Sequence, residues 1–568
     1  MKAQFWLGLA FFLPLAQGKS QGLIIPQGIS MVATGGNILL DGNWTNNGTF
    51  KHNDGAVIFT GDTQSVTGSA ATVFNNITIA EASTTTIASG QYLKGYMICD
   101  GMLYANGNLT LLSTSEQTAL IDGTGKGEVL GNVSMQRYLA HGFGYKYFSS
   151  PYNDATVGEF SDDIDLQSAF PAFYKYDETR TSSGWVDYTD PTGLLLPLRG
   201  YAANVGNSLQ EKTVEIAGVV NNGDISAVFY NSGKTFTEGF NLVGNPYPSP
   251  IDWDSAAGWD RTNIDDAIYY FDAGITDPYL GTYSSYINGI SSDGVANNII
   301  PAMQGFFVHV SNGTYPVSGN LGINNNARVN NLIPVFHKPA PETRAVIRLS
   351  AASGESADPV VVYFDDKATV GFDKSLDALK LMNTDTDVPN LYARTGDKKI
   401  SIYALPGENT GIDIVPLGVT MKKDGTVNFV ADAIERMPPG LKPYFVDILT
   451  GTVQDMYKNN EYQVILTSGA HENRFFLVFS TGDISEQSFF RDAFSVSAFN
   501  GKIYVHLNMT SSGKGHILIT NMAGQIVMRE KVDGFGTHEF DAGWSMGMYI
   551  VTLVTDDNKY SKKVSIIN

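Results

Sequence analysis

The chain of 568 residues contains enough hydrophobic residues, 43%, to fill the cores of about three or four domains at roughly 150 residues each. Charged residues reach only 17% and glycine occurs 59 times, a composition typical of extracellular β-proteins with frequent turns. The formal net charge of -20 argues against nucleic acid or an anionic membrane as partner, because both require clustered Lys and Arg.

The first residues have the build of a secretory signal peptide. Lys2 supplies a positive charge, and the apolar run Phe5–Leu15 follows it. Ala16 and Gly18 place small residues at the cleavage site, so we expect a signal peptide over residues 1–18. The alternative for the apolar run is a buried helix. The run is too short to cross a bilayer and no other run is long enough, so we expect no transmembrane segment.

Residues 19–135 alternate short apolar runs with turns rich in Gly and Asn. The segments Gly42–Gly48 and Gly101–Asn108 resemble two versions of one turn-and-strand unit. Stacked coils explain such a repeat, because each coil points apolar side chains inward and places Gly and Asn at tight corners. The pattern favours a short β-solenoid, with a β-sandwich as the alternative. Cys99, the only cysteine, lies in an apolar run, so we expect a buried thiol and no internal disulfide.

The middle of the chain predicts two further β modules. Residues 136–335 contain aromatic runs of strand length bounded by Gly, Pro, Asn and Asp, which indicates a sandwich or jelly-roll-like module. Residues 336–482 predict another β-sandwich, with clear alternation of apolar and polar residues at Ala345–Ser350. Helix signals are sparse, and we expect single helical turns only at Leu376–Met382 and Ala431–Arg436.

After a polar linker at Ser480–Gln487, residues 490–568 predict a compact β domain. Lys502–Asn508 alternates apolar and polar side chains, a turn at Asn521–Gly524 joins two strands, and Gly547–Leu553 pairs with a last strand across another turn. The whole chain is therefore predicted to be all-β and multidomain, with a solenoid-like N-terminal region, sandwich modules and a small C-terminal β-sandwich.

The segments HILITNMAGQIV, FDAGWSMGMYIVTL and KYSKKVSI resemble the type A sorting domain of the type IX secretion system of Bacteroidota. In that family a strand runs into an N..G..V turn, a D...L..G.Y.V.L unit follows, and a K..K.I.I strand closes the domain. The matching residues, which form the expected sorting signal, are Asn521, Gly524, Val527, Asp541, Gly547, Tyr549, Val551, Leu553, Lys559, Lys563, Ser565 and Ile566. The chain departs from the family at Phe494–Asn500, where a YPNP-like turn is common.

The resemblance implies a route and partners rather than a chemistry. It implies Sec export, removal of the signal peptide, passage of the outer membrane through the type IX machinery, and removal of the sorting domain by a sorting peptidase. Such cargo is released from a Gram-negative cell or attached to surface lipopolysaccharide. Lys559, Lys562 and Lys563 form a basic patch that would steer docking, or alternatively protect an edge strand from aggregation.

No catalytic constellation stands out in the sequence. The histidines show no HExxH spacing, and no GxSxG motif occurs. The acidic clusters are Asp162 with Asp163 and Asp165, Asp252 with Asp254, and Asp265 with Asp266. Turn residues are a commoner explanation for such clusters than the paired carboxylates of a glycosidase. We expect no catalytic residue, cofactor or metal, with calcium at the EF-hand-like start Asn383-x-Asp385-x-Asp387 as the alternative.

Aromatic residues are dense between positions 170 and 290. They are Trp185, Tyr188, Tyr201, Trp253, Trp259, Tyr269, Tyr270, Tyr279, Tyr283 and Tyr286. If buried, they form the core of a β module, which is the interpretation we favour, and if exposed they form stacking platforms for sugars or partner proteins. The sequence therefore predicts a structural or adhesive surface protein with an unknown extracellular ligand. The alternative is a secreted glycan-binding protein or glycoside hydrolase that uses residues 170–290.

Overall fold

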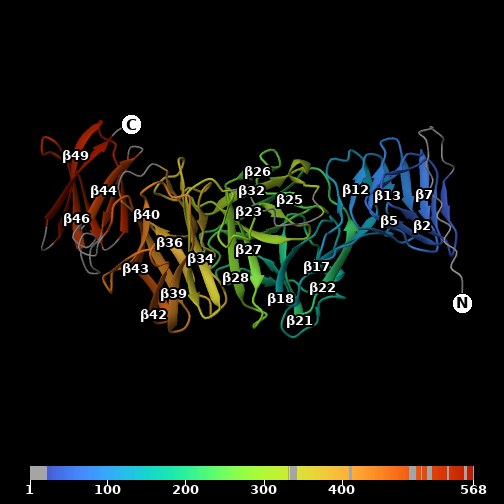
Figure 1. Ribbon diagram of the computed structural model, residues 1–568, viewed down its shortest axis with the longest axis horizontal. Helices are drawn as coiled ribbons and strands as arrows, with labels where there is room; N and C mark the ends of the chain where they lie inside the picture. Colours follow the sequence, from blue (N-terminus) through green and yellow to red (C-terminus); the bar gives the residue numbers. More distant parts are fainter. Residues whose placement is uncertain are drawn as a thin grey trace.

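The computed structural model describes residues 22–330, 332, 342–407, 412–484, 494–499, 502–507, 514–533, 536–555 and 559–566. The expected signal peptide, with Ala16 and Gly18, lies outside these residues. Within them the regular structure is β-strand apart from two short 3-10 helices, η1 (Val157–Phe160) and η2 (Asn325–Ala327), so the predicted all-β class is confirmed. The sheets follow one another along one long axis, from the solenoid to the C-terminal sandwich (Figure 1).

The N-terminal region is a parallel β-solenoid. Its strands are β1 (Leu23–Ile25), β2 (Ser30–Ala33), β3 (Ile38–Leu40), β4 (Trp44–Asn46), β5 (Thr49–His52), β6 (Ala56–Phe59), β7 (Thr63–Thr67), β8 (Val73–Phe74), β9 (Asn76–Ile79), β10 (Thr84–Ile87), β11 (Gln91–Leu93), β12 (Tyr96–Cys99), β13 (Met102–Tyr104), β14 (Leu109–Leu111), β15 (Leu120–Ile121) and β16 (Glu128–Leu130). Every third strand joins the same sheet, as in β1-β4-β7-β10-β13-β16, and the pairs are parallel. The predicted solenoid is therefore confirmed over the sandwich alternative.

The coils stack because each sends one row of apolar side chains inward. Trp44 is fully buried, its ring meets that of Phe50 edge-on at 4.8 Å, and its Nε1 donates to Thr72 Oγ1 at 3.0 Å. Tight corners require glycine: Gly68 has a φ of +137°, and a Cβ there would collide with the backbone of Asn46. The expected pattern of inward apolar residues and corner glycines is thus present in the structure.

The last solenoid sheet continues into the next module. Strand β17 (Asn132–Leu139) pairs in parallel with β14 and antiparallel with β22 (Lys212–Val219). One apolar core accordingly runs from Ile25 in the first coil to Met303. The solenoid is thus the first part of a continuous body.

Four sheets build the aromatic-rich module. Its other strands are β18 (Gly142–Ser149), β19 (Phe173–Tyr176), β20 (Trp185–Asp187), β21 (Gly200–Ser208), β23 (Ile225–Asn231), β24 (Phe240–Gly244), β25 (Ile251–Asp252), β26 (Trp259–Thr262), β27 (Ile264–Ala273), β28 (Gly281–Ile287), β29 (Ile290–Ser291), β30 (Ile299–Ile300), β31 (Gly305–Val310) and β32 (Val317–Ile323). The sheet orders are β18-β21-β19-β20, β24-β31-β27-β28-β29, β23-β32-β26 and β25-β30. The first two share an aromatic core that includes Tyr147 and Phe307.

A single 11-stranded sheet forms the third region. Its strands are β33 (Val346–Ser353), β34 (Ser356–Asp365), β35 (Ala378–Leu379), β36 (Asn390–Thr395), β37 (Lys398–Pro406), β38 (Ile412–Met421), β39 (Gly425–Glu435), β40 (Lys442–Asp447), β41 (Thr452–Asp455), β42 (Glu461–Leu466) and β43 (Gly469–Ser480). The sheet rolls over so that Phe429 on β39 meets Phe445 on β40 with ring centroids 4.7 Å apart. Sandwich-like packing therefore arises from one sheet whose two halves face each other.

The two helical turns expected in this region are wrong. Ala431 lies in β39, where it pairs with Leu349 of β33, and Ala378 lies in β35, where it pairs with Ile402 of β37. Local helix preference is a weak signal, and pairing of β39 with β33 and β42, and of β35 with β37, overrides it here.

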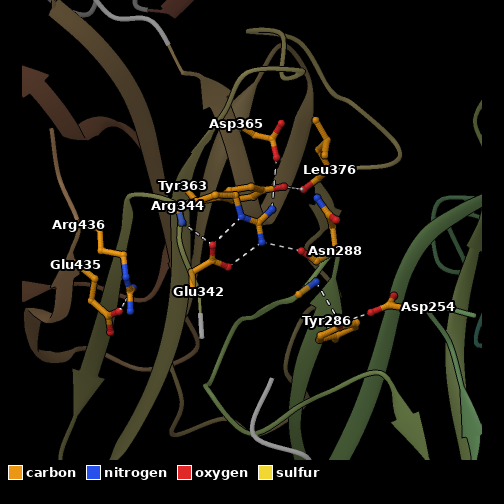
Figure 2. A network of polar contacts seen from close by, with 11 residues as sticks. Asp254, Tyr286, Asn288, Glu342, Arg344, Tyr363, Asp365, Leu376, Glu435 and Arg436 are labelled. Carbon is orange, nitrogen blue, oxygen red and sulfur yellow. Dashed lines mark hydrogen bonds and ion pairs between the residues drawn. The ribbon is translucent and has the colours of Figure 1, made fainter. Parts of the chain in front are cut away.

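Arg344 joins the rolled sheet to the aromatic-rich module (Figure 2). It donates to Glu342 at 2.7 Å and to the carbonyl of Asn288, in the β28–β29 turn, at 2.7 Å, and its guanidinium lies 4.7 Å from the Tyr363 ring centroid. Burial would raise the pKa of Glu342, but hydrogen bonds from Arg344 outweigh it and lower that pKa below its ordinary value. Together with the apolar core that both regions share, the hydrogen bond from Arg344 to the Asn288 carbonyl makes the junction a packed interface.

The C-terminal region is a two-sheet sandwich. Its strands are β44 (Phe494–Phe499), β45 (Lys502–Leu507), β46 (Lys514–Asn521), β47 (Ile526–Asp533), β48 (Gly536–Asp541), β49 (Gly547–Thr555) and β50 (Lys559–Ile566). The sheets have the orders β44-β45-β48 and β47-β46-β49-β50. Their core contains only side chains from residues 494–566, including the expected inward row Ile503, Val505 and Leu507. The sandwich therefore has a core of its own.

Candidate functional site

The sorting-signal residues Asn521 and Gly524 form the tight turn between β46 and β47. The Asn521 side chain accepts hydrogen bonds from the backbone N–H groups of Ala523, at 3.1 Å, and Gln525, at 3.0 Å. Gly524 has a φ of +82°, which favours glycine. These two motif residues therefore fix the backbone conformation of a surface turn.

Four further motif residues lie on β49, where it pairs with β50. Val551 and Leu553 are fully buried, and Tyr549 is 5% exposed and donates to the carbonyl of Ser545 at 2.7 Å. The exposed Gly547 begins the strand with a φ of +155°, in a region that side-chain-bearing residues rarely adopt. These residues hold the sandwich together.

Of the remaining motif residues, Ile566 is buried in the sandwich core, Val527 is half-buried against it, and the others are exposed. Asp541 is exposed at the end of β48, and Lys559 and Lys563 are exposed on β50, an edge of its sheet among the described residues. Lys562 is half-buried and its side chain alternates to the other face, so the expected patch of three lysines is divided between two faces. Lys559 and Lys563 are thus the two motif cations presented together to a partner.

An Asp–His pair is buried in the aromatic-rich module. His309 Nδ1 lies 2.6 Å from Asp265 Oδ2, and Ser311 donates to the other carboxylate oxygen at 2.5 Å. Both His309 and Asp265 are at most 2% exposed. No side chain among the described residues hydrogen-bonds His309 Nε2, so the pair lacks the nucleophile that a hydrolase triad requires.

The His309 ring borders a polar cavity of about 530 Å³ between the aromatic-rich module and the rolled sheet. Lys380 also borders it, but its ammonium is committed to the buried carboxylate of Asp358 at 2.6 Å. Within the parts of the chain that the structure describes, no group of three or more His, Cys, Asp or Glu is placed to hold a metal ion.

The acidic clusters are held by hydrogen bonds and ion pairs. The contacts are Asp163 with Lys212, Asp252 with Asn298, Asp254 with Tyr286, Asp265 with His309 and Asp266 with Arg261. Asp162 and Asp165 are exposed in a turn, as predicted. For Asp265 and Asp266 the turn interpretation is wrong, because both lie on strand β27.

The expected calcium-loop residues make internal contacts. Asn383 Oδ1 accepts from the backbone N–H of Tyr283 at 2.8 Å, Asp385 accepts from the N–H of Asp387 at 2.9 Å, and Lys423 forms an ion pair with Asp387 at 2.5 Å. A bound calcium ion would have to compete with these donors, and calcium at this loop stays a prediction.

Cys99 is buried on β12, as expected. Burial raises the pKa of its thiol to about 12, and the thiol donates to the carbonyl of Glu128 at 3.3 Å. A thiol with so high a pKa is a poor nucleophile at neutral pH.

Burial was predicted for the dense aromatic residues, and four of the ten are buried in the cores while five others are half-buried against them. Trp253, Tyr269 and Tyr286 are at most 2% exposed, whereas Tyr279 is 50% exposed. Tyr279 stands at a cavity of about 340 Å³ that is lined mainly by aromatic side chains, including Tyr147, which was not singled out in the sequence. The alternation of Tyr145 and Tyr147 on β18 was the available signal, because such spacing places both rings on one face of a strand.

The sandwich and its motif residues define a protein that carries a secretion-sorting domain. Residues 499–567 match the family described as secretion system C-terminal sorting domain, which confirms the resemblance seen in the sequence. The domain directs the chain through the type IX secretion system to the cell surface or the extracellular space. Among the described residues, no helix is long and apolar enough to cross a membrane.

The body of the chain belongs to a second family. Residues 39–479 match the family described as domain of unknown function (DUF8693), and since the match covers most of the chain, the chain belongs to this family. That one match includes solenoid coils, the aromatic-rich module and the rolled sheet.

No curated protein matches the chain. Among solved structures it is similar to a β-D-glucuronidase from Dictyoglomus thermophilum, with 9% identity over 61% of this chain and 36% of that chain, and a TM-score of 0.11. A β-glucuronidase from Ruminococcus gnavus in complex with uronic isofagomine matches with 10% identity over 76% of this chain and 44% of that chain, also with a TM-score of 0.11. The chain thus spans less than half the length of these enzymes, and TM-scores this low do not indicate a shared fold.

Proposed function

We propose that this chain is a structural or adhesive protein of the outer cell surface, without catalytic activity, whose C-terminal sandwich is a removable export signal. The observation that carries this proposal is the separate core of the sandwich. A domain with its own core can be cut away without exposing apolar side chains of the body. The sandwich also lies at the opposite end of the long axis from the solenoid, which remains accessible to partners (Figure 1).

The contacts of the polar groups support a role without catalysis. The acidic clusters that would serve a glycosidase hold Lys212, Arg261, Tyr286 and other partners instead. A glycosidase requires two carboxylates that face each other across a sugar site, and no carboxylate of the described residues lines the aromatic cavity. On this proposal the body acts by binding partners through its surface.

The proposed processing removes both ends of the precursor. Cleavage after Gly18 releases the signal peptide, and the sorting peptidase removes the sandwich, after which the body is released or attached to lipopolysaccharide. We expect intact mass spectrometry of surface and medium fractions to show a body that lacks residues 1–18 and the sandwich. A surface protein that still ends at Asn568 would contradict the removable signal.

A matched pair of glycine variants tests the role of the sandwich. Gly547→Val should leave the protein in the periplasm, because valine is strained at a φ of +155° and would disrupt the start of β49. Gly543→Val is the control, since Gly543 is exposed, has no positive φ and has open space around it. Immunoblots of periplasmic and surface fractions read the result, and normal display of Gly547→Val and of Tyr549→Asp would refute the sorting role.

Surface recognition can be separated from folding. Reversing both exposed cations, Lys559→Glu with Lys563→Glu, leaves the core untouched and should reduce export if the basic face steers docking. Normal export of this variant would favour the alternative, in which the lysines only protect the edge strand.

A further inference from the structure

The aromatic cavity is assembled from segments far apart in the sequence. Strand β18 contributes Tyr145 and Tyr147, β28 contributes Tyr283, and two loops contribute Phe170 and Tyr279. Its volume of about 340 Å³ falls within the range of small-molecule sites. Strands β18, β21, β27 and β28, which surround it, lie together in the middle of the molecule (Figure 1).

The inner wall of the cavity is preorganised. The Tyr147 ring stacks on Phe271 at 4.9 Å, with 18° between the ring planes, and lies 5.6 Å from Trp185. On the side that faces the core, the Tyr147 ring meets the Phe307 ring edge-on at 5.6 Å, and this contact holds the Tyr147 ring in place. A ligand that enters therefore meets rings that are already in place and orders little of the protein.

The rim of the cavity exposes two large aromatic rings. Phe170 is 57% exposed and Tyr279 is 50% exposed, and their rings meet edge-on at 5.1 Å. Tyr279 in turn lies 5.9 Å from Tyr145 inside the cavity. The aromatic surface is thus continuous from solvent to interior, and a neighbouring pair of exposed rings of this size marks a binding surface more often than a packing fault.

Polar groups at the cavity are hydroxyls. Tyr147 and Tyr283 share one hydrogen bond of 2.8 Å between their hydroxyl oxygens, so one phenolic hydrogen of the pair remains for a ligand. Burial raises the pKa of Tyr283 to about 12 and also raises that of Tyr147 well above its ordinary value, so both hydroxyls stay neutral at physiological pH. Ser183 accepts from the N–H of Trp185 and retains its own hydrogen.

Among the described residues, no side chain that lines the cavity carries a charge, and those other than aromatic rings are Ser183, Ala202 and Thr384. An anionic or cationic ligand would lose its hydration there without gaining a counterion. A wholly apolar ligand would leave the hydroxyls of Tyr147 and Tyr283 without new partners. The chemistry therefore fits a neutral molecule that has an apolar face and hydroxyl groups along its edge.

We propose that this cavity binds a neutral pyranose ring of a glycan. The C–H face of such a ring packs on aromatic planes, and its hydroxyls reach the Tyr147–Tyr283 pair. This inference deepens the adhesive role proposed above and depends on it for its biological meaning. Its test uses purified protein, so failure of binding leaves the export proposal untouched, and failure of export leaves the binding result valid.

Calorimetric titration of the purified full-length chain tests the site. The neutral probes are lactose, cellobiose and maltose, the anionic probe is 3′-sialyllactose, and N-acetyltyrosinamide represents an aromatic peptide side chain. We expect at least one neutral disaccharide to bind, with at least tenfold weaker affinity in Tyr279→Ala and in Phe170→Ala. Both residues are half or more exposed, so these variants should fold.

Two further variants make the result specific. Phe236→Ala is the matched control, because Phe236 is 72% exposed and does not line the cavity, and its affinity should stay within twofold of the parent chain. Tyr147→Phe keeps the ring and removes one hydroxyl, and should weaken sugar binding by a smaller factor than Tyr279→Ala. The proposal is overturned if no neutral sugar binds, if only N-acetyltyrosinamide binds, if the anionic sugar binds more tightly than lactose, or if Tyr279→Ala and Phe170→Ala bind like the parent.

Discussion

The solenoid at one end of the molecule and the sorting sandwich at the other are both built from short strands. The two regions differ in how far apart in the sequence the paired strands lie. In the solenoid, Thr84 lies beside Thr63 in a parallel sheet, one coil earlier in the chain. In the sandwich, β46 pairs with β47 and β49 with β50 as antiparallel neighbours in the sequence. Stacked coils can continue into whatever follows, whereas hairpins close on themselves.

The cores differ in the same way. The solenoid core continues through β17 and β22 to Met303, so the first coils and the aromatic-rich module stabilise each other. The sandwich core stops at its own residues. The two ends therefore differ in one respect: the solenoid shares its core with the rest of the body, and the sandwich has a separate core.

The largest expected effect is in the solenoid. Trp44→Ala removes a fully buried ring and should lower the free energy of unfolding of the body by about 3–5 kcal/mol. Because the core is continuous, hydrogen exchange should also rise in β17 and β22. Tyr92→Ala, at an outward position that is 39% exposed, is the control and should change little. Faster exchange confined to the mutated coil would contradict the continuous core.

A smaller and local effect is expected in the sandwich. Leu553→Ala should destabilise that domain by about 2–4 kcal/mol, because Leu553 is fully buried in a small core. Calorimetry should show a lower melting temperature for the sandwich and an unchanged transition for the body. Met548→Ala, at a position 44% exposed on the same strand, should leave both transitions in place. A body transition that moves with Leu553→Ala would mean that the cores are coupled.

A further expected effect concerns pH. Burial raises the pKa of Asp413, on β38 of the body, to about 7, above the ordinary value of about 3.9 in an unfolded chain. The folded body therefore holds a proton that the unfolded chain releases, so the contribution of Asp413 to stability is greatest below about pH 4 and is lost as pH rises towards 7. Asp413 alone should contribute a loss of about 1.4 kcal/mol for each pH unit in this window.

The sandwich should not share that response. Among its described residues, the groups with a resolved pKa shift are Lys502 and Tyr504, and both pKa values are raised from 10 or above, so these two groups keep one protonation state across this window. Denaturant titrations at several pH values should show a slope for the body that Asp413→Asn flattens. An unchanged slope in Asp413→Asn would assign the pH response to another group.

Alternation of apolar and polar residues in the sequence predicted many of the strands and buried side chains at both ends of the molecule. Ile503, Val505 and Leu507 were expected on one face and are buried, because alternation fixes the side-chain direction on a strand. Ala431 was wrongly expected in a helical turn, because its neighbours favour helix locally and nothing in the sequence announces Leu349 as its sheet partner. The candidate cavity shows the same limit, since Phe170 and Tyr279 reach Tyr145 only through folding.

The sequence by itself determined the all-β class, the coil repeat and the sorting-domain motif, since strand alternation, glycine corners and hairpin turns depend on residues close together in the chain. Only the tertiary structure decided that one core joins the solenoid to Met303, that the third region is one rolled sheet, and that rings from distant loops surround a cavity. The physical reason is that packing joins residues hundreds of positions apart, and their partners are set by the shape of the folded chain.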